Sequence, residues 1–391
     1  MKTSTSVTAA KDAIRRQNLS ALLRQVHART TVSRVVLGQL LGLSKTTISE
    51  LVSELEAVGL VDRVGNEQKA AAGRPSQLVA ASKKPLVLVV NPEIDGITIA
   101  FVNFAAEILE TEFVEFESAY SLETTATLVR DFIDKHQKFH KGKIFGAVFA
   151  IPGAIDKTNS KLIDAPSLGW SDLDIVEELT KTLKLRVWIT NNARAATVSE
   201  HLFGAAKGLQ NAICLFSGVG GIGGGFIVNG RVLEGSNGIA GEIGKMNLIS
   251  SGNRNAQTFG ELMRRDEIVS ALGKKRLSDA ELDSMLSSSN HLEVNKAIDA
   301  QVSLLLAAIK TLRDLFDPEA VILGGFLGSL VKSRKKQLLK SMNHDSLKTR
   351  GDEFLIPRAA ELKPMVLIGA AESAWEQILS DPINQYRKAN K

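Results

Sequence analysis

Cysteine, aromatic residues and long apolar runs are all scarce in this sequence. The single cysteine, Cys214, excludes an internal disulfide and a zinc finger built on cysteine pairs. Unbroken apolar runs such as residues 86–90 fall far short of the ~18 residues that a membrane span requires. Residues 1–11 are rich in Ser and Thr and lack the apolar stretch of a secretory signal. We therefore expect a cytoplasmic protein without membrane contacts, in which Cys214 packs in a core.

The positive charge is concentrated near the N-terminus. The chain of 391 residues has a net charge of +5 and 44% hydrophobic residues, which is typical of a globular protein long enough for two or three domains. Residues 1–84 alone contain 13 Lys and Arg against 6 Asp and Glu. This asymmetry favours a nucleic-acid-binding head on a near-neutral body. The alternative is a basic arm that only keeps the protein soluble.

The pattern of the first 60 residues predicts a helix-turn-helix. A first helix has an apolar face made of Ile14, Leu19, Leu22, Leu23 and Val26. Ser33 is a good N-cap for a second helix over residues 34–41, and Gly42 supplies the turn that ends it. Ser44 then caps a third helix, whose polar first turns would face DNA. The DNA-binding candidates on this helix are Lys45, Thr46, Thr47 and Ser49.

The residues that follow predict a wing. Residues 60–64 and 78–80 are expected to pair as strands, joined by a loop over residues 65–77. In this loop Arg74 stands between a glycine and a proline, which keep the backbone slim and stiff, so we expect Arg74 to enter an A·T-rich minor groove. The alternative is a solvated loop arginine. Residues 1–84 are thus predicted to form a winged helix-turn-helix domain.

From residue 86 onward the sequence predicts an α/β fold. Apolar strands alternate with helices, and no repeat is visible at the sequence level. The expected strands cover residues 86–90, 97–102, 145–151, 186–190 and 320–323. The expected helices cover residues 122–136 and 294–316, with a closing helix from residue 370.

Glycine is concentrated in one stretch, residues 218–245, which contains 11 of the 31 glycines. Apolar residues alternate there with turn signals such as Asn229-Gly230, so the stretch is a folded sheet and not a linker. Glycines in a sheet permit positive φ or let another group approach the backbone. We expect a ligand to approach here. The alternative is a glycine-rich hairpin that binds nothing.

Several short stretches, weak one by one, together resemble the ROK family of sugar kinases and sugar-responsive repressors. Two are the Gly-Glu-Ile-Gly-Lys run at residues 241–245 and the glycine run at residues 221–225. The others are residues 150–156, residues 165–170, Asn191-Asn192 at a strand end, and the late Pro-Glu-Ala-Val-Ile-Leu-Gly-Gly element. The resemblance covers nearly the whole chain, and the winged head matches the repressor branch.

The resemblance implies a two-lobed, actin-like body with a sugar cleft between the lobes. The first lobe would span residues 85–195, and the second, with the C-terminal helix, residues 196–391. The ligand-binding residues that it implies are Gly153, Ser167, Asn191, Asn192, Glu242 and Lys245.

The sequence departs from the kinases of the family at the catalytic positions. Their Asp-x-Gly-Gly-Thr phosphate loop is matched here by residues 91–95, Asn-Pro-Glu-Ile-Asp, which replace glycine amides with a carboxylate and a branched side chain. Their catalytic Asp is matched by Asn192, whose amide cannot accept a proton from a sugar hydroxyl. We therefore expect no catalytic residue, no cofactor and no enzymatic activity.

Three positions change the expected ligand and metal chemistry. The resemblance places Lys245 where the family has a sugar-contacting His and Ser167 where it has an Asn, while Glu242 is kept. The family's zinc-binding cysteines are missing between residues 245 and 259, so no metal is expected. A lysine at 245 favours an anionic ligand such as a sugar phosphate. The alternative, that Lys245 pairs with Glu242, stays open at this point.

These observations predict a regulator of transcription, a repressor of carbohydrate genes whose kinase-like cleft binds a sugar or sugar derivative without turning it over. Its partners would be a palindromic, A·T-rich operator in double-stranded DNA, the sugar effector, and a second copy in a homodimer or higher homo-oligomer. Two alternatives remain: a sugar kinase with a regulatory DNA-binding head, and a ligand-independent regulator whose cleft is vestigial.

Overall fold

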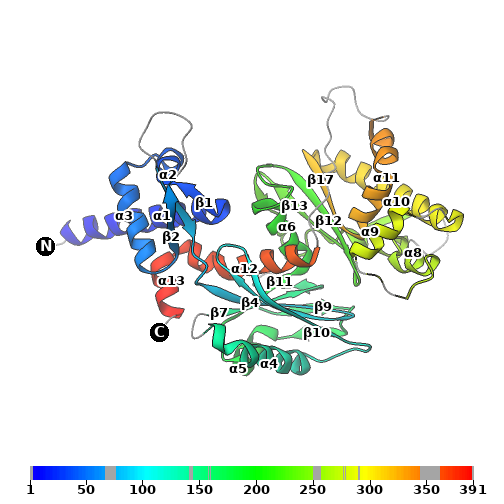
Figure 1. Ribbon diagram of the computed structural model, residues 1–391, viewed down its shortest axis with the longest axis horizontal. Coiled ribbons are helices and arrows are strands. Elements are labelled where there is room, and N and C mark those ends of the chain that lie inside the picture. The colour runs from blue at the N-terminus through cyan, green and yellow to red at the C-terminus, as the bar shows by residue number, and fades with distance from the viewer. Residues whose placement is uncertain are drawn as a thin grey trace.

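The computed structural model describes residues 3–66, 76–140, 144–156, 158, 160–249, 257–275, 277, 279–288, 291–343 and 362–389. Figure 1 shows a small N-terminal head beside a body of two lobes, one built on the sheet that contains β4 and the other on the sheet that contains β12. The fold class is therefore the predicted one, a winged helix-turn-helix followed by a two-lobed α/β body. Among the described residues, no helix is long and apolar enough to cross a membrane.

The head has the predicted helix-turn-helix and wing strands. Ser33 and Ser44 accept hydrogen bonds from the backbone N–H groups of Val36 and Thr47, and Gly42 ends the second helix with φ 65°. Strand β1 pairs with β3 and was not predicted, because three residues are too few to show a period. The elements of the head are α1 (Thr3–Arg29), β1 (Thr31–Ser33), α2 (Arg34–Leu41), α3 (Lys45–Ala57), β2 (Val61–Asn66) and β3 (Gln77–Ala81).

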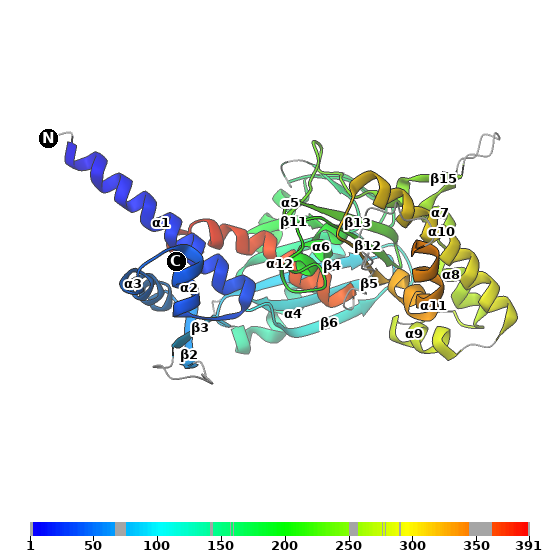
Figure 2. The same cartoon turned by 90° about the horizontal axis from the view of Figure 1, so that it is seen from above.

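The apolar face of α1 begins later than predicted. Leu19, Leu22, Leu23 and Val26 are buried, but Ile14 is 57% exposed. Figure 2 shows that the N-terminal half of α1 extends beyond the rest of the head, away from the core that buries the other four residues. The predicted burial of Ile14 is therefore wrong.

The first lobe is a five-stranded sheet in the order β11-β7-β4-β5-β6. Alternate residues of β4 belong to two different cores: Leu88 and Val90 pack with α4 and α5, whereas Val87 and Val89 pack with α12. Burial on both faces explains the unbroken apolar run in the sequence. The sheet and its helices are β4 (Leu86–Glu93), β5 (Gly96–Asn103), β6 (Ile108–Glu115), α4 (Leu122–His140), β7 (Ile144–Ile151), α5 (Ile175–Leu183) and β11 (Val187–Asn191).

A second small sheet and one helix complete the edge of the first lobe that faces the cleft. The sheet has the order β10-β9-β8, and the helix starts directly after β11. These elements are β8 (Ala154–Ile155), β9 (Leu162–Ala165), β10 (Trp170–Leu173) and α6 (Asn192–Leu202).

The second lobe is a four-stranded sheet in the order β14-β13-β12-β17, with helices on its outer side (Figure 1). The long helix predicted at residues 294–316 is α10, and its buried residues form one core with β12, β17 and α11. The elements are β12 (Ala212–Gly218), β13 (Gly221–Val228), β14 (Arg231–Val232), η1 (Ile243–Lys245), β15 (Asn247–Ile249), β16 (Gln257–Thr258), α7 (Phe259–Leu262), α8 (Arg265–Ala271), α9 (Asp279–Ser288), α10 (Leu292–Phe316), β17 (Ala320–Gly325) and α11 (Phe326–Asn343).

The chain ends with α12 (Leu362–Ser380) and α13 (Pro382–Ala389). The prediction that the closing helix starts at residue 370 is wrong by two turns. Pro364 lies in the first turn, where its missing N–H has no intrahelical partner to lose, and Gly369 lies where α12 crosses α6. Although α12 follows the second lobe in the chain, it packs against α6 and against β4 and β7 of the first-lobe sheet.

Candidate functional site

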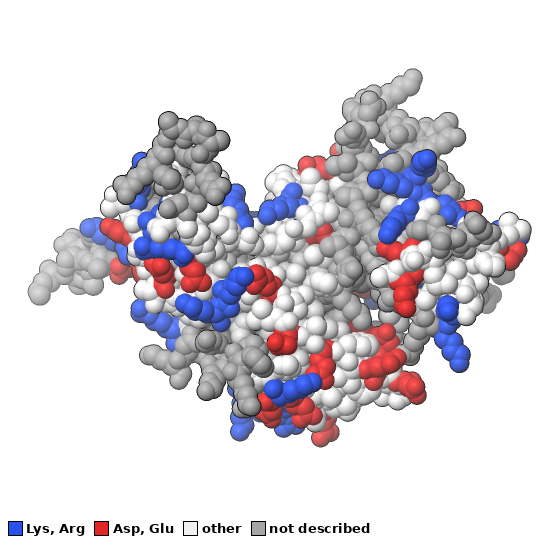
Figure 3. All heavy atoms as spheres, viewed as in Figure 1, with Lys and Arg blue, Asp and Glu red and all other residues white. Residues whose placement is uncertain are grey.

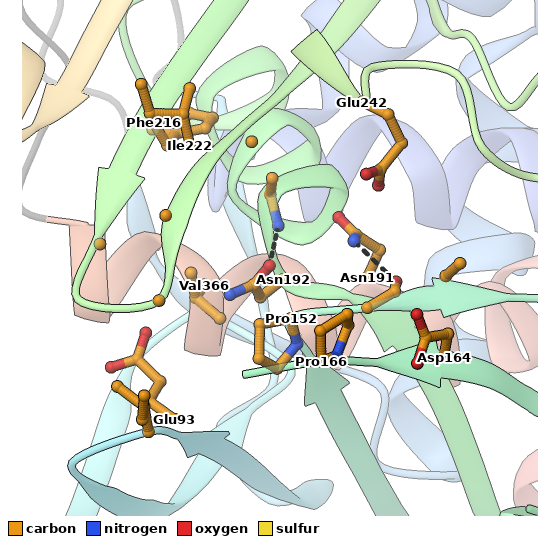
Figure 4. Close-up of a pocket in the computed structure, with 18 of the residues that line it drawn as sticks. Glu93, Pro152, Asp164, Pro166, Asn191, Asn192, Phe216, Ile222, Glu242 and Val366 are labelled. Carbon is orange, nitrogen blue, oxygen red and sulfur yellow. Dashed lines mark hydrogen bonds between the residues drawn. The ribbon is translucent and has the colours of Figure 1, made fainter. Parts of the chain in front are cut away.

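A cleft of about 180 Å³ opens between the two lobes, where β4, β11 and the β12–β13 hairpin end (Figure 4). Its position at strand ends is the place where ligands bind in α/β folds. Five of the six ligand-binding candidates line it: Gly153, Asn191, Asn192, Glu242 and Lys245. The sixth, Ser167, lies behind the hairpin turn, where its Cβ and Oγ would be 3.6 Å from a Cβ placed on Gly220. The structure thus brings together residues that are up to 92 positions apart in the sequence.

Asn191 holds two elements of the cleft in place. Its Oδ1 accepts a hydrogen bond from the Arg194 N–H at 3.0 Å and caps α6, while its Nδ2 donates to the Gly153 carbonyl at 3.0 Å. Because both ends of the amide are used, Asn191 positions the cleft wall and has little left to offer a ligand. Asn192 differs, since its Oδ1 accepts from the Ala193 N–H at 2.8 Å, and among the lining residues drawn in Figure 4 its Nδ2 has no acceptor.

The glycines of β13 serve two purposes. A Cβ on Gly223 would lie 2.6 Å from the Ala193 Cβ, and one on Gly225 would lie 2.2 Å from the Thr197 Oγ1, so these glycines let α6 pack onto the strand. Gly220 and Gly221 instead form the cleft side of the hairpin turn, and a Cβ on Gly221 would meet no atom within 4 Å. Among the described residues, this turn leaves room for a ligand to approach the backbone, whereas the other glycines of the stretch that packing or positive φ explains, such as Gly225 and Gly230, do not require a ligand.

The loop at residues 91–95 lies at the cleft, as the resemblance implied. Glu93 is 8% exposed and Ile94 is 48% exposed, and both line the cavity. The Tyr120 hydroxyl donates to the Glu93 carbonyl at 2.5 Å and fixes the turn. Burial, together with the charges of Glu93 and Asp95, raises the pKa of Tyr120 well above its usual value. A carboxylate therefore occupies the place where a phosphate loop offers backbone N–H groups.

The charge of the cleft is negative. Glu93, Asp164 and Glu242 line it, and the only lysine in its lining is Lys245. The Lys245 Nζ lies 3.4 Å from the Glu242 Oε2, and its side chain is 74% exposed. Arg194, near Glu242, donates to the Gly238 carbonyl, and burial lowers the pKa of its guanidinium. The sequence leaves two alternatives for Lys245, an anionic ligand or a pair with Glu242. Among the described residues, the structure shows the pair with Glu242.

Sequence reasoning missed Asp164, Phe216 and Val366, which also line the cleft. Asp164 of β9 pairs with Ala154 of β8. It lies one residue before residues 165–170, one of the stretches that carry the family resemblance. Phe216 and Val366 are apolar residues inside a strand and a helix, and nothing local distinguishes them from core residues. Val366 enters from α12, about 170 residues after Asn192, so only the folded chain shows it.

The first turn of α3 presents the DNA-binding candidates unequally. Lys45 and Thr46 are exposed. Thr47 and Ser49 are half-buried, and the Thr47 Oγ1 lies 2.9 Å from the Ser44 Oγ in the N-cap. The Arg34 Nη1 lies 3.4 Å from the Ser49 Oγ. Arg74 lies outside the described residues.

Much of the positive charge of the head is neutralised by ion pairs. Figure 3 shows Lys and Arg interleaved with Asp and Glu over the head. The pairs are Arg15–Glu54, Arg24–Glu376, Arg63–Glu56, Lys83–Glu107 and Lys84–Asp62.

Comparison with known proteins points in the same direction. The chain is 30% identical to a xylose repressor of Bacillus spizizenii over 243 residues, which are 61% of this chain and 62% of the repressor. It is 23% identical to the DNA-binding transcriptional dual regulator NagC of Escherichia coli K12, over 97% of both chains. Its fold matches the crystal structure of a ROK family transcriptional regulator, a homologue of the E. coli Mlc protein, with a TM-score of 0.74 and 19% identity over 96% of this chain and 99% of the other.

The family profile that matches this chain is that of the ROK family, over residues 94–372. This range includes Asn191, Asn192, Glu242 and Lys245 and ends in α12, so it covers most of the cleft lining and parts of both lobes. The chain belongs to the ROK family.

Proposed function

We propose that this protein is a sugar-responsive transcriptional repressor. The observation that carries the proposal is the combination, in one chain, of a capped helix-turn-helix with wing strands and a ROK cleft in which Glu93 and Asn192 stand where the kinases have a glycine and an aspartate. The head supplies DNA binding and the cleft supplies a ligand site. Neither DNA binding by the head nor ligand binding by the cleft requires the protein to catalyse a reaction of the ligand.

The names of the relatives support the regulatory function. NagC, which aligns over the whole chain, is a DNA-binding transcriptional regulator, and the Bacillus relative is a xylose repressor. The alignment with the xylose repressor spans less than two thirds of that protein, so xylose is one member of a test panel and not an assigned effector. The operator, proposed to be palindromic, would be bound by two heads of a homodimer or a higher homo-oligomer.

We propose further that the cleft is not catalytic. The ROK family includes kinases, so the distinction rests on residues of this chain. Transfer of a phosphoryl group needs donors around the phosphates and a base at the sugar hydroxyl. Glu93 would repel the phosphates, and the Asn192 Oδ1 is already hydrogen-bonded to the Ala193 N–H.

The ligand that suits this cleft is an uncharged sugar. Asn192, Glu242 and the backbone of the hairpin turn offer donors and acceptors for hydroxyl groups, and the carboxylates Glu93 and Asp164 disfavour an anion. Lys245, the lysine in the described cleft lining, lies beside Glu242 and pairs with it.

One experiment tests the function as a whole. The purified protein selects fragments from its own genome, and the retained fragments are titrated by mobility shift with and without a panel that includes D-xylose, D-glucose and N-acetyl-D-glucosamine. We expect specific retention of few fragments and a change in affinity with one sugar class. Uniform retention of all fragments, at any sugar concentration, would argue against a regulator.

A further inference from the structure

Two helices run from the cleft to the same point on the DNA-binding head. Helix α6 starts at the cleft with Asn191 and Asn192 and ends at Phe203. Helix α12 has Val366 in the cleft wall and Glu372 six residues later, about 9 Å along its axis. Figures 1 and 2 show α12 running from beside the head across the body.

The point where they meet is His27, at the end of α1. His27 is 2% exposed, its Nδ1 lies 2.8 Å from the Phe104 carbonyl oxygen, and its Nε2 lies 3.0 Å from both carboxylate oxygens of Glu372. Its ring stacks on Phe104 with centroids 4.4 Å apart and meets the edge of Phe203 at 5.8 Å. A side chain of the head is thus held by Phe104 directly after β5, by Phe203 directly after α6, and by Glu372 of α12.

The rest of the contact between α1 and α12 fixes their relative position. Arg24 donates two hydrogen bonds to Glu376, and the Ser20 hydroxyl donates to the Leu379 carbonyl at 2.6 Å. Beneath these polar contacts, a single cluster of buried side chains continues from α1 through Trp375 to Ala195 of α6. The head is therefore packed on α12 and is not a separate body on a linker.

Close packing between α6 and α12 makes independent movement of either helix costly. A Cβ on Gly369 would lie 1.7 Å from the Ala195 carbonyl oxygen, so the two backbones are in direct contact at this crossing. Packed interfaces of this kind shift as units and do not deform gradually. A displacement at the cleft end of α12 must then appear at its head end.

We propose that α12 transmits occupancy of the cleft to the DNA-binding head, with the contact between Glu372 and His27 as the joint. The inference deepens the proposed function, because it names the path by which a bound sugar would change the placement of α3. A ligand that contacts Val366 or Asn192 more closely in one lobe arrangement shifts α12, and α1 follows through His27. Glu372 acts as a positioning residue, since it does not line the cleft.

The test is hydrogen exchange on the free, full-length protein. It needs neither DNA nor sugar, so its result can be interpreted even if the protein proves not to be a sugar-responsive repressor. Val366→Phe places a ring in the cleft as a substitute for a ligand. We expect it to change the exchange rates of amides in α1 by about two- to thirtyfold. This factor corresponds to the coupling energies that mutations along such a path typically change. Asp164→Asn, a cleft variant on β9 that keeps the size of the side chain, is the matched control and should leave α1 unchanged.

The joint itself is tested by repeating Val366→Phe in a Glu372→Gln background. We expect the effect on α1 to disappear, while exchange within the cleft still responds. If Glu372→Gln lowers the yield of folded protein, His27→Gln tests the same contact from the other side. The inference is overturned if Val366→Phe leaves α1 unchanged, or if its effect on α1 persists within about twofold in both joint variants.

Discussion

Lys245 and Glu242 form an ion pair at the rim of the cleft, with the Lys245 Nζ 3.4 Å from the Glu242 Oε2. The lysine stands where the family resemblance places a histidine, and its positive charge pairs with a carboxylate of the protein itself. The side chain is 74% exposed, so the pair contributes little to stability. Its main consequence is that the cleft keeps the negative charge of Glu93 and Asp164.

The first prediction concerns ligand charge. Two like charges about 8 Å apart repel by about 2 kcal/mol at an effective dielectric constant of about 20. We therefore expect calorimetry to find a phosphorylated sugar bound at least about tenfold more weakly than its uncharged form. Lys245→Ala should widen the difference, because Glu242 then loses its cation. Tighter binding of the phosphorylated form to the natural protein would refute an uncharged ligand.

The second prediction separates the two adjacent asparagines. Asn191→Ala removes the cap of α6 and the bond to Gly153, so the free energy of unfolding in urea should fall by about 1 kcal/mol or more. Asn192→Ala, the matched control, should change stability less and weaken sugar binding more. Equal stability losses in both variants would contradict the distinction between a positioning and a ligand-facing asparagine.

The third prediction concerns DNA. Thr46 is exposed, whereas the Thr47 hydroxyl is hydrogen-bonded in the N-cap. In mobility-shift titrations at fixed salt, Thr46→Ala should reduce discrimination between operator and random DNA by about 1–3 kcal/mol without changing the melting temperature. Thr47→Ala should lower the melting temperature as well.

The control for this prediction is Thr311→Ala on α10, another exposed helical threonine, whose hydroxyl donates to the Ala307 carbonyl. It should affect neither DNA binding nor discrimination. The predicted minor-groove contact of Arg74 can be measured in the same titrations on operators with and without A·T-rich flanks. Retention of full discrimination in both Thr46→Ala and Arg74→Ala would count against the winged-helix interface.

The fourth prediction is that neither the natural protein nor Asn192→Asp turns over ATP in the presence of a hexose. A restored base contributes about 10²–10⁴-fold, but phosphoryl transfer depends mainly on groups that hold the phosphates. Those groups remain missing, because Glu93 and Ile94 stand in the loop. A coupled assay for ADP checks this. Sugar-dependent ADP release by the natural protein, well above background, would establish the kinase alternative.

The fifth prediction concerns pH. Burial alone would lower the pKa of His27, and the charge of Arg24 acts in the same direction, but the carboxylate of Glu372 and the Phe104 carbonyl outweigh both and raise the pKa above 6.5. Arg24 in turn pairs with Glu376. A raised pKa means that the charged contact is fully present below the ordinary value and is lost as the pH rises through the folded value.

Thermal unfolding between about pH 6 and about pH 9 measures this effect. The natural protein should be more stable than His27→Gln at the acidic end, and the difference should shrink toward the alkaline end. A difference that grows with pH would show that His27 is held neutral and that Glu372 accepts from an imidazole N–H only.

Much of the head and many strands follow from the sequence alone. The helices α2 and α3 begin and end where Ser33, Gly42 and Ser44 predict, because caps and turns depend on residues within four positions of each other. The buried strands β4, β5 and β7 follow from their apolar runs, since burial on both faces leaves no other pattern.

Only the tertiary structure decided what several of these residues do. The sequence places Asn191 and Asn192 at a strand end, but the Gly153 carbonyl that accepts a hydrogen bond from Asn191 lies in the turn between β7 and β8. The density of glycine in β13 predicts a close approach, but that α6 makes most of it depends on how the helix crosses the strand. Val366 in the cleft and Glu372 at His27 depend on a helix that returns to the first lobe from the end of the chain. Contacts between residues hundreds of positions apart leave no local pattern, because the chain in between fixes neither their distance nor their orientation until the cores have packed.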